Sequence, residues 1–174
     1  KGNIIDGDKL IAILSRYMKE MGTLKNNTAV VTVMSNLGFH RFMNENKIET
    51  VCTKVGDRYV LEEMLNNGYN IGGEQSGHII FKEHATTGDG LLTALKLLEV
   101  MHKTGKGIVE LKDGLKIYPQ LLINVPVKDK EAAMQADPIV KEVAAINEEL
   151  QGNGRILVRP SGTEPLVRVM VEAE

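Results

Sequence analysis

The sequence is short of the residue types that several classes of protein need. Cys52 is the only cysteine among the 174 residues, so no disulfide can form within the chain, and we expect a reducing, cytoplasmic environment. There is no signal-peptide pattern and no apolar run long enough to span a bilayer, so we expect no membrane association. The formal net charge of −2 argues against nucleic acid as a partner, because no broad basic surface is available. An anionic ligand must therefore be held by a local site.

Aromatic residues are also scarce, at 4% of the chain, and tryptophan is absent. Modules that stack sugar rings on aromatic faces need more of them, so a sugar would have to be recognised by hydrogen bonds and charge. Apolar residues nevertheless make up 43% of the chain, which is enough for a hydrophobic core.

Candidate strands and helices alternate along the first two thirds of the chain. β-branched residues mark a buried strand at 28–35, and apolar residues repeat at helical spacing in 9–18. Further strands are expected at 48–53, 70–71 and 77–81, and further helices at 37–46, 58–66 and from residue 90. This alternation predicts a three-layer mixed α/β domain with a largely parallel sheet.

The helix after Asp89 is the most strongly patterned of these elements. Asp89 is expected to cap its N-terminus. Its apolar stripe is expected to consist of Leu91, Leu92, Leu95, Leu98 and Met101.

Glycines between residues 105 and 114 loosen the chain, and we predict a linker there, with domains at 1–112 and 113–174. Strands are expected at 121–127, 154–158 and 166–172, with one or two helices within 132–150. The second domain is therefore predicted to be a small α+β domain. Both ends of the sequence are abrupt, which suggests a piece of a longer protein, truncated at its C-terminus.

Residues 159–165, Arg-Pro-Ser-Gly-Thr-Glu-Pro, concentrate anion-binding groups at the end of a strand. The predicted phosphate ligands are Arg159, Ser161, Gly162, Thr163 and Arg168. Arginine offers a fork of charged donors, and glycine lets backbone N–H groups turn toward an anion. Glu164 would repel a phosphate, so we expect it to pair with an arginine or face away. A β-turn with purely local hydrogen bonds is the alternative.

Residues 72–78, Gly-Gly-Glu-Gln-Ser-Gly-His, carry groups suited to sugar hydroxyls. Glu74, Ser76 and His78 alternate with other residues, so in an extended segment they would face the same way. With Gln75 they form the predicted sugar-binding set. A glycine-rich bend with a surface glutamate and an incidental histidine is the alternative.

The strand-to-helix junction at residues 54–58 is a second place where α/β folds hold ligands. Lys54 and Arg58 are candidates to contact a sugar there, whereas Asp57 is equally suited to capping the helix.

The remaining Asp, His and Cys residues give weaker indications of a metal site or a reactive group. Residues 6–8, Asp-Gly-Asp, are better explained as a capped helix start than as a metal loop. The histidines show no zinc-ligand spacing. Cys52 falls inside a strand and is expected in the core.

Residues 72–78 and 159–165 resemble two motifs of the α-D-phosphohexomutase superfamily, in the same order. The runs at 33–36 (Val-Met-Ser-Asn) and 55–59 (Val-Gly-Asp-Arg-Tyr) are also similar to its members. Gln75 is the variant associated with the branch that acts on glucosamine phosphate. The resemblance covers the whole chain and assigns it to the third and fourth of four domains.

The resemblance implies a mutase, an isomerase that interconverts glucosamine 6-phosphate and glucosamine 1-phosphate through a phosphoserine and a bisphosphate, which serves as intermediate or activator. This reaction would feed UDP-N-acetylglucosamine and cell-wall synthesis. It also implies Mg²⁺, but the family's Ser-His-Asn and Asp-Gly-Asp-x-Asp-Arg runs are absent here. The catalytic serine and the metal ligands are therefore expected in missing N-terminal domains. His78 and Lys54 match auxiliary positions, and the whole enzyme is a possible homodimer.

Two other interpretations remain open. The chain could be a non-catalytic module that binds sugar phosphates, or part of a phosphomannomutase or phosphoglucomutase relative. In every case we expect the loops at 72–78 and 159–163 to bind the ring and the phosphate of one ligand, and we expect this chain alone to be inactive.

Overall fold

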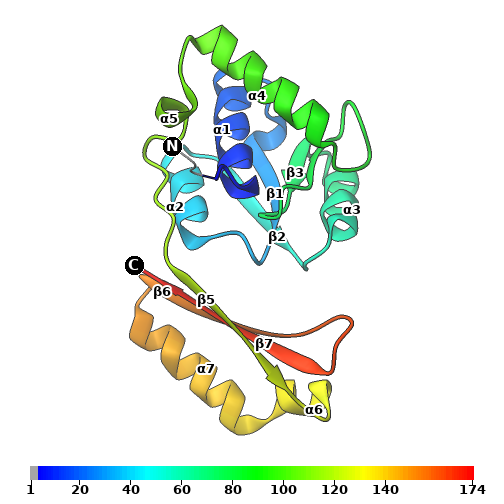
Figure 1. The fold of residues 1–174 in the computed structure, drawn as a ribbon, viewed down its shortest axis with the longest axis vertical. Helices are drawn as coiled ribbons and strands as arrows, with labels where there is room; N and C mark the ends of the chain where they lie inside the picture. Colours follow the sequence, from blue (N-terminus) through cyan, green and yellow to red (C-terminus); the bar gives the residue numbers. More distant parts are fainter. Residues whose placement is uncertain (1–3) are drawn as a thin grey trace. The chain divides into compact units, whose positions relative to one another are not determined.

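The computed structural model describes residues 4–174, and the chain divides into two units, Lys1–Lys116 and Ile117–Glu174. Each unit has its own sheet (Figure 1). The division falls a few residues beyond the predicted one. The stretch predicted as a linker instead contains the short helix α5 (Ile108–Leu111). It belongs to the first unit because Leu111 is buried in that core and its carbonyl oxygen accepts a hydrogen bond from Arg16 Nη2 at 2.6 Å.

The first sheet is built around β1 (Thr28–Thr32), whose five residues are all buried. The strand order is β2 (Glu49–Thr53), β1, β3 (Ile71–Gly73) and β4 (Ile79–Phe81). β1 runs parallel to β2 and β3, and β4 is antiparallel to β3. The parallel pairing brings the carboxyl ends of three strands to one side of the sheet. We call this side, where the residues following β1, β2 and β3 emerge, the carboxyl edge.

Helices cover both faces of this sheet, so the predicted three-layer arrangement is confirmed (Figure 1). On one face, Ala29 and Val31 share a core with α1 (Gly7–Glu20) and α2 (Leu37–Glu45). On the other face, Val30 packs with Val60 and Met64 of α3 (Asp57–Asn67). The alternation of side chains along β1 divides its residues between the two cores.

Three of the helices are capped at their N-termini by short polar side chains. Asp6 accepts a hydrogen bond from the Lys9 N–H at 3.0 Å, and Asp89 accepts one from the Leu92 N–H at 2.9 Å at the start of α4 (Gly90–Thr104). Asn36 caps α2 in the same way. The predicted caps at the first helix and at Asp89 are confirmed. Asp8, in the first turn of α1, has a buried carboxylate that accepts a 2.8 Å hydrogen bond from the Asn36 N–H and so ties α1 to α2.

The predicted apolar stripe of α4 describes its buried face only in part. Leu91, Leu95 and Leu98 are 74%, 57% and 58% exposed. Leu92 and Met101 of the stripe do pack against the core, together with Thr93 and Val100, which are buried. This helix is apolar on more than one side, so its spacing alone does not identify the side that packs on α1.

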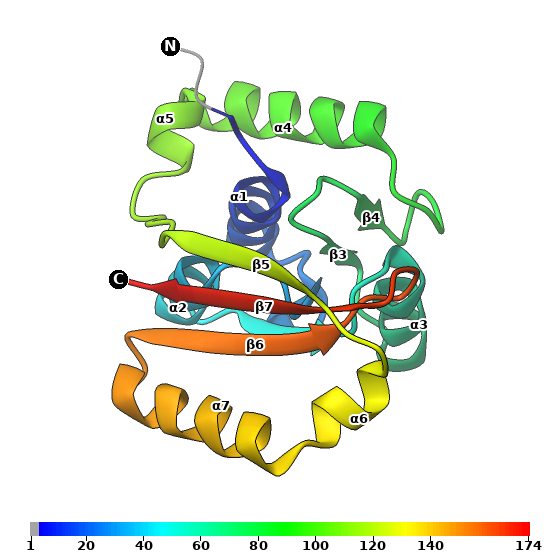
Figure 2. The same ribbon diagram turned by 60° about the horizontal axis from the view of Figure 1, so that its bottom comes forward.

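The second unit is an antiparallel sheet of three strands in the order β5 (Gln120–Pro126), β7 (Leu166–Ala173) and β6 (Gly154–Pro160). Figure 2 shows α6 (Lys130–Gln135) and α7 (Asp137–Leu150) on one side of this sheet. An apolar pocket of about 250 Å³ lies between these helices and the sheet, and it is lined by Ile139 and Val143 of α7 together with Val167 and Val169 of β7. The small α+β domain is therefore as predicted.

Gly72, in the middle of β3, tests how tightly the first unit is packed. A Cβ at this position would lie 2.7 Å from Met64 Sδ and 2.8 Å from the backbone oxygen of Val30. We expect Gly72→Ala to lower the free energy of unfolding by about 1–3 kcal/mol, because the backbone of β1 has little room to move. Urea denaturation followed by circular dichroism measures this change.

Gly90 offers a matched control, since no atom lies within 4 Å of a Cβ there. Gly90→Ala should leave stability unchanged or slightly higher. Equal stability of both variants would contradict the packing described for Gly72.

Candidate functional site

Two loops of the first unit meet at the carboxyl edge. Glu74, which follows β3, accepts a hydrogen bond through Oε1 from the Gly56 N–H at 2.9 Å. Gly56 lies between β2 and α3 and has φ of +130°, a conformation that favours glycine. Lys54 and Arg58 lie on either side of Gly56 in the chain, and both are exposed. The structure thus brings the predicted glutamate to the segment that carries the two predicted cations.

The loop between β3 and β4 is a turn, so the alternation argument for Glu74, Ser76 and His78 does not apply. The Gly77 N–H donates to the Glu74 carbonyl oxygen at 2.9 Å, and Gly77 has φ of +103°. Ser76 and His78 are both exposed. Their availability to a ligand comes from the turn rather than from a shared face of a strand.

The N-terminus of α1 packs directly against this turn. The Gly7 N–H donates to the carbonyl oxygen of Gln75 at 2.9 Å, and a Cβ on Gly7 would lie only 2.0 Å from the carbonyl oxygen of Glu74. Gly7 is therefore required for close approach. Gly88 has a similar role, because a Cβ there would lie 3.2 Å from the Cα of His78. The sugar-binding candidates thus lie on a loop braced at two points.

In the second unit, Arg159 of β6 and Arg168 of β7 are directly opposite each other in the strand register. Val167 and Val169 point to the helices, so Arg168 points to the other face of the sheet. Burial, and then the charge of Arg168, lower the pKa of Arg159 below its usual value. The Nε atoms of both arginines are buried and have no hydrogen-bond partner. Two like charges held together in this way favour an anion between them.

The loop after β6 presents two unpaired backbone donors. Within residues 4–174, the N–H groups of Gly162 and Thr163 have no hydrogen-bond partner, and both residues are exposed. A Cβ on Gly162 would meet no atom within 4 Å, so the space beside it is open. Consecutive free N–H groups at an exposed turn are donors that an anion can use.

Ser161 and Glu164 complete the internal bonding of this loop. Ser161 is 3% exposed, and its Oγ accepts a hydrogen bond from the Glu164 N–H at 3.3 Å. Its own N–H donates to the Leu166 carbonyl oxygen at 2.9 Å. Glu164 pairs with Arg168 at 3.0 Å, which confirms the expectation that it pairs with an arginine. Ser161 therefore shapes the loop, while Gly162 and Thr163 form its open surface.

One loop contact was missed by the sequence reasoning. Lys130, the first residue of α6, donates from Nζ to the carbonyl oxygen of Ser161 at 2.8 Å. The two residues lie 31 positions apart, and no local pattern links them.

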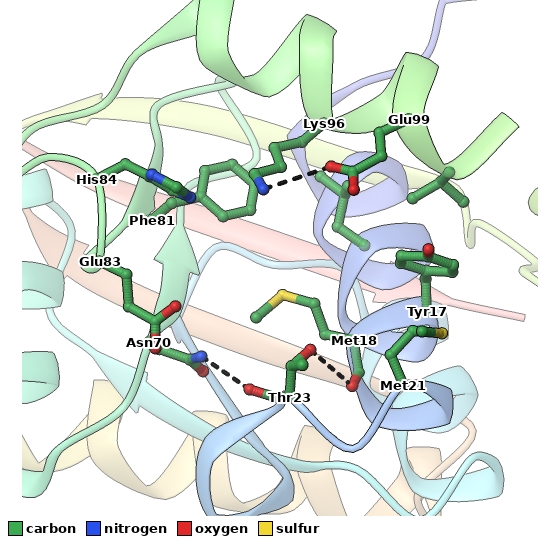
Figure 3. A pocket seen from close by; sticks show the side chains of 12 residues that line it. Tyr17, Met18, Met21, Thr23, Asn70, Phe81, Glu83, His84, Lys96 and Glu99 are labelled. Atoms are coloured by element: carbon green, nitrogen blue, oxygen red, sulfur yellow. Dashed lines mark hydrogen bonds and ion pairs between the residues drawn. The ribbon is translucent and has the colours of Figure 1, made fainter. Parts of the chain in front are cut away.

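A pocket of about 230 Å³ lies near the amino ends of β1 and β3, opposite the carboxyl edge that carries the candidate site. Figure 3 shows Tyr17 and Met18 of α1, with Met21 directly after that helix, on one side of it, and Lys96 and Glu99 of α4 on another. Asn70 donates to the Thr23 carbonyl oxygen at 2.9 Å at its base, and these residues precede β3 and β1. None of the residues predicted to bind a sugar or a phosphate lines this pocket.

Cys52 does not lie in the core, so that prediction is wrong. It is exposed because β2 is an edge strand, and its Sγ lies 3.9 Å from His40 Nε2. Among residues 4–174 no group of three or more His, Cys, Asp or Glu side chains lies close enough to hold a metal ion. No helix formed by these residues has the length and apolar character needed to cross a membrane.

Comparison with known proteins agrees with both units. Residues 6–118 match the family described as phosphoglucomutase/phosphomannomutase, alpha/beta/alpha domain III, and residues 122–174 match the C-terminal domain of the same family. The chain therefore belongs to the phosphoglucomutase/phosphomannomutase family, of which it carries two domains.

Curated relatives and solved structures agree with this assignment. The chain is 59% identical over 174 residues to a phosphoglucosamine mutase of Shouchella clausii and 58% identical over 173 residues to that of Geobacillus thermodenitrificans. It spans only 39% of the length of each of these proteins. An N-acetylphosphoglucosamine mutase of Aspergillus fumigatus has the same fold, with a TM-score of 0.81 at 20% identity over 98% of this chain and 40% of that one.

The bond between Glu74 and Gly56 can be tested directly. We expect Glu74→Ala to speed hydrogen exchange of the Gly56 amide by about tenfold or more, since a charged hydrogen bond contributes about 1.5–3 kcal/mol. Glu74→Gln, which retains an acceptor, should give a smaller change. Amide exchange followed by NMR measures both, with Glu62→Ala on the exposed side of α3 as the control. Unchanged exchange in Glu74→Ala would show that the two loops are not joined in solution.

Proposed function

We propose that this chain is the substrate-recognition portion of a phosphoglucosamine mutase, which interconverts glucosamine 6-phosphate and glucosamine 1-phosphate. The observation that carries this proposal is the pair Arg159 and Arg168, directly opposite each other on β6 and β7, with the loop that follows β6 offering the N–H groups of residues 162 and 163. Holding two guanidinium groups together costs free energy, and Glu164 pairs with Arg168 alone, so a bound anion would stabilise the arginine pair. The mutase names of its relatives at 59% and 58% identity supply the substrate class.

At the phosphate end, Arg159 and Arg168 donate charged hydrogen bonds to phosphate oxygens, and the Gly162 and Thr163 N–H groups add neutral ones. The Thr163 hydroxyl is exposed and adds a further donor. Ser161 belongs to this set through the loop that it shapes. Arginine forks match phosphate geometry, so the phosphate is both bound and oriented.

At the sugar end, Glu74 accepts hydrogen bonds from ring hydroxyls through Oε2, since Oε1 accepts the hydrogen bond from the Gly56 N–H. Gln75, Ser76 and Arg58 contact the same ring. His78 and Lys54 are exposed near the carboxyl edge and act as auxiliary groups beside the reacting oxygens.

Both groups of residues serve positioning and charge stabilisation, which carry most of the catalysis of phosphoryl transfer. A fixed phosphate site holds the phosphate that is not reacting, in either orientation of a bisphosphate intermediate. The phosphoryl donor, a phosphoserine, and the Mg²⁺ ligands are assigned to the part of the longer protein that precedes this chain. The Aspergillus fumigatus N-acetylphosphoglucosamine mutase has been solved in complex with GlcNAc-6P and magnesium. Residues 4–174 contain no group of three or more His, Cys, Asp or Glu side chains that could hold a metal ion, so none of them is assigned as an Mg²⁺ ligand.

A mutase acting on mannose or glucose phosphates is the second candidate, since the family descriptions name both activities. Gln75, in the sugar loop, favours the glucosamine branch by resemblance. A stand-alone module that binds sugar phosphates without catalysis is the third candidate, and the length of the relatives disfavours it.

We expect Arg159→Ala to weaken the binding of glucosamine 6-phosphate by about 1.5–3 kcal/mol, the contribution of a charged hydrogen bond. Calorimetric titration of the 174-residue chain, and of the longer enzyme that contains it, measures this. Lys141→Ala removes an exposed positive charge on α7 and should change the affinity by less than about 0.5 kcal/mol. Equal affinities of the two variants would argue against the phosphate site.

Turnover separates the recognition role from catalysis. The chain alone should produce no glucosamine 1-phosphate, because no phosphoryl donor is assigned to it, whereas the longer enzyme should. Phosphorus NMR of the reaction mixture distinguishes the two sugar phosphates. Turnover by the chain alone would overturn the proposal, and preference of the longer enzyme for mannose or glucose phosphates would favour the second candidate.

A further inference from the structure

Lys130, on α6, contacts the loop of residues 161–165, which we call the phosphate loop. It contacts the backbone of this loop rather than its open surface. Its Nζ donates to the Ser161 carbonyl oxygen at 2.8 Å, in a partly buried position. An ammonium group bound to a carbonyl oxygen contributes a charge-assisted hydrogen bond, which is about twice as strong as a neutral one. Lys130 therefore restrains one particular peptide group of the loop.

That peptide group joins Ser161 to Gly162. A peptide bond is planar, and those of residues 4–174 are trans, so its C=O and N–H point in opposite directions. Because Lys130 holds the carbonyl oxygen on one side, the Gly162 N–H points to the other side. This is the N–H that has no partner and that adjoins open space.

Glycine makes such a restraint necessary. Gly162 has no side chain to limit its backbone, and the flanking peptide can rotate as a unit at little steric cost. Ser161 is anchored at its other end, since its N–H binds the Leu166 carbonyl oxygen. Lys130 and Leu166 thus hold the two peptide groups on either side of Ser161.

We propose that Lys130 is a positioning residue for phosphate: by binding the Ser161 carbonyl oxygen it aims the Gly162 N–H at the phosphate and prevents the peptide from turning over. This inference rests on the proposed phosphate-binding role of the loop. The charge of Lys130 also polarises the peptide group, which makes the Gly162 N–H a better donor. Lys130 itself does not touch the ligand.

The affinity test uses the 174-residue chain with inorganic phosphate and with glucosamine 6-phosphate. We expect Lys130→Met to weaken binding of both about tenfold, near the lower end of the range for a charged hydrogen bond. Lys130→Arg, which keeps the charge and the donor, should recover most of the affinity. Lys128→Met removes an exposed charge two residues earlier and should change the affinity less than twofold. Equal losses in Lys130→Met and Lys128→Met would overturn the proposal.

A second measurement needs no ligand. In Lys130→Met the Gly162 amide resonance should shift and broaden, because the peptide gains a second orientation, while the resonances of β6 stay in place. In Lys128→Met the Gly162 resonance should be unchanged. An unaltered Gly162 resonance in Lys130→Met would overturn the proposal by itself.

The two measurements separate failure of this inference from failure of the proposed function. If the unmodified chain binds neither phosphate nor glucosamine 6-phosphate, the phosphate site is wrong, and Lys130 is no positioning residue for it. If the unmodified chain binds and Lys130→Met binds equally well, the phosphate site stands and only the role of Lys130 is refuted. Thermal unfolding of each variant confirms that it is folded.

Discussion

Arg159 lies directly opposite Arg168 because β6 and β7 pair in one register, and this juxtaposition of two positive charges is the constraint on which the second unit's chemistry depends. Two guanidinium groups repel each other, and burial of their Nε atoms adds to the cost of keeping both charged. The sheet tolerates this because ladder hydrogen bonds hold the strands, and Glu164 neutralises part of the charge at Arg168. A slip of one residue would send one arginine to the helix-covered face and separate the pair on which the proposed phosphate site depends.

The first unit depends on pairing of a different kind. The parallel alignment of β1 with β2 and β3 brings the segments after β2 and β3 to the same edge, where Glu74 meets Gly56. Glycines make the meeting possible, since Gly7 admits the turn against α1 and Gly56 adopts a conformation that side chains disfavour. In both units the polar groups are exposed on loops, while packed strands and helices determine where those loops lie.

Much of the fold followed from local patterns. The buried β-branched run of β1, the amphipathic spacing of α1 and the caps at Asp6 and Asp89 depend on neighbouring residues alone, and these predictions are confirmed. The pairing of Glu164 with Arg168 was also foreseeable, because a carboxylate in a basic loop has few other stable arrangements. The predictions that failed depended on distant contacts. Cys52 is exposed because its strand is at the edge of the sheet, and α5 replaces part of the predicted linker because Leu111 packs into the core.

The sequence by itself determined most of the elements, the two-domain order and the residue types of both loops, because hydrophobic periodicity, helix caps and glycine-rich turns act over a few residues. Only the tertiary structure decided that Glu74 binds Gly56, that Ser161 is turned inward and that Lys130 holds the phosphate loop. These contacts join residues that local spacing does not relate, or choose between orientations that have similar local energies. Strand order, register and packing make that choice, since a hydrogen bond forms only between groups that the whole fold has brought within about 3 Å of each other.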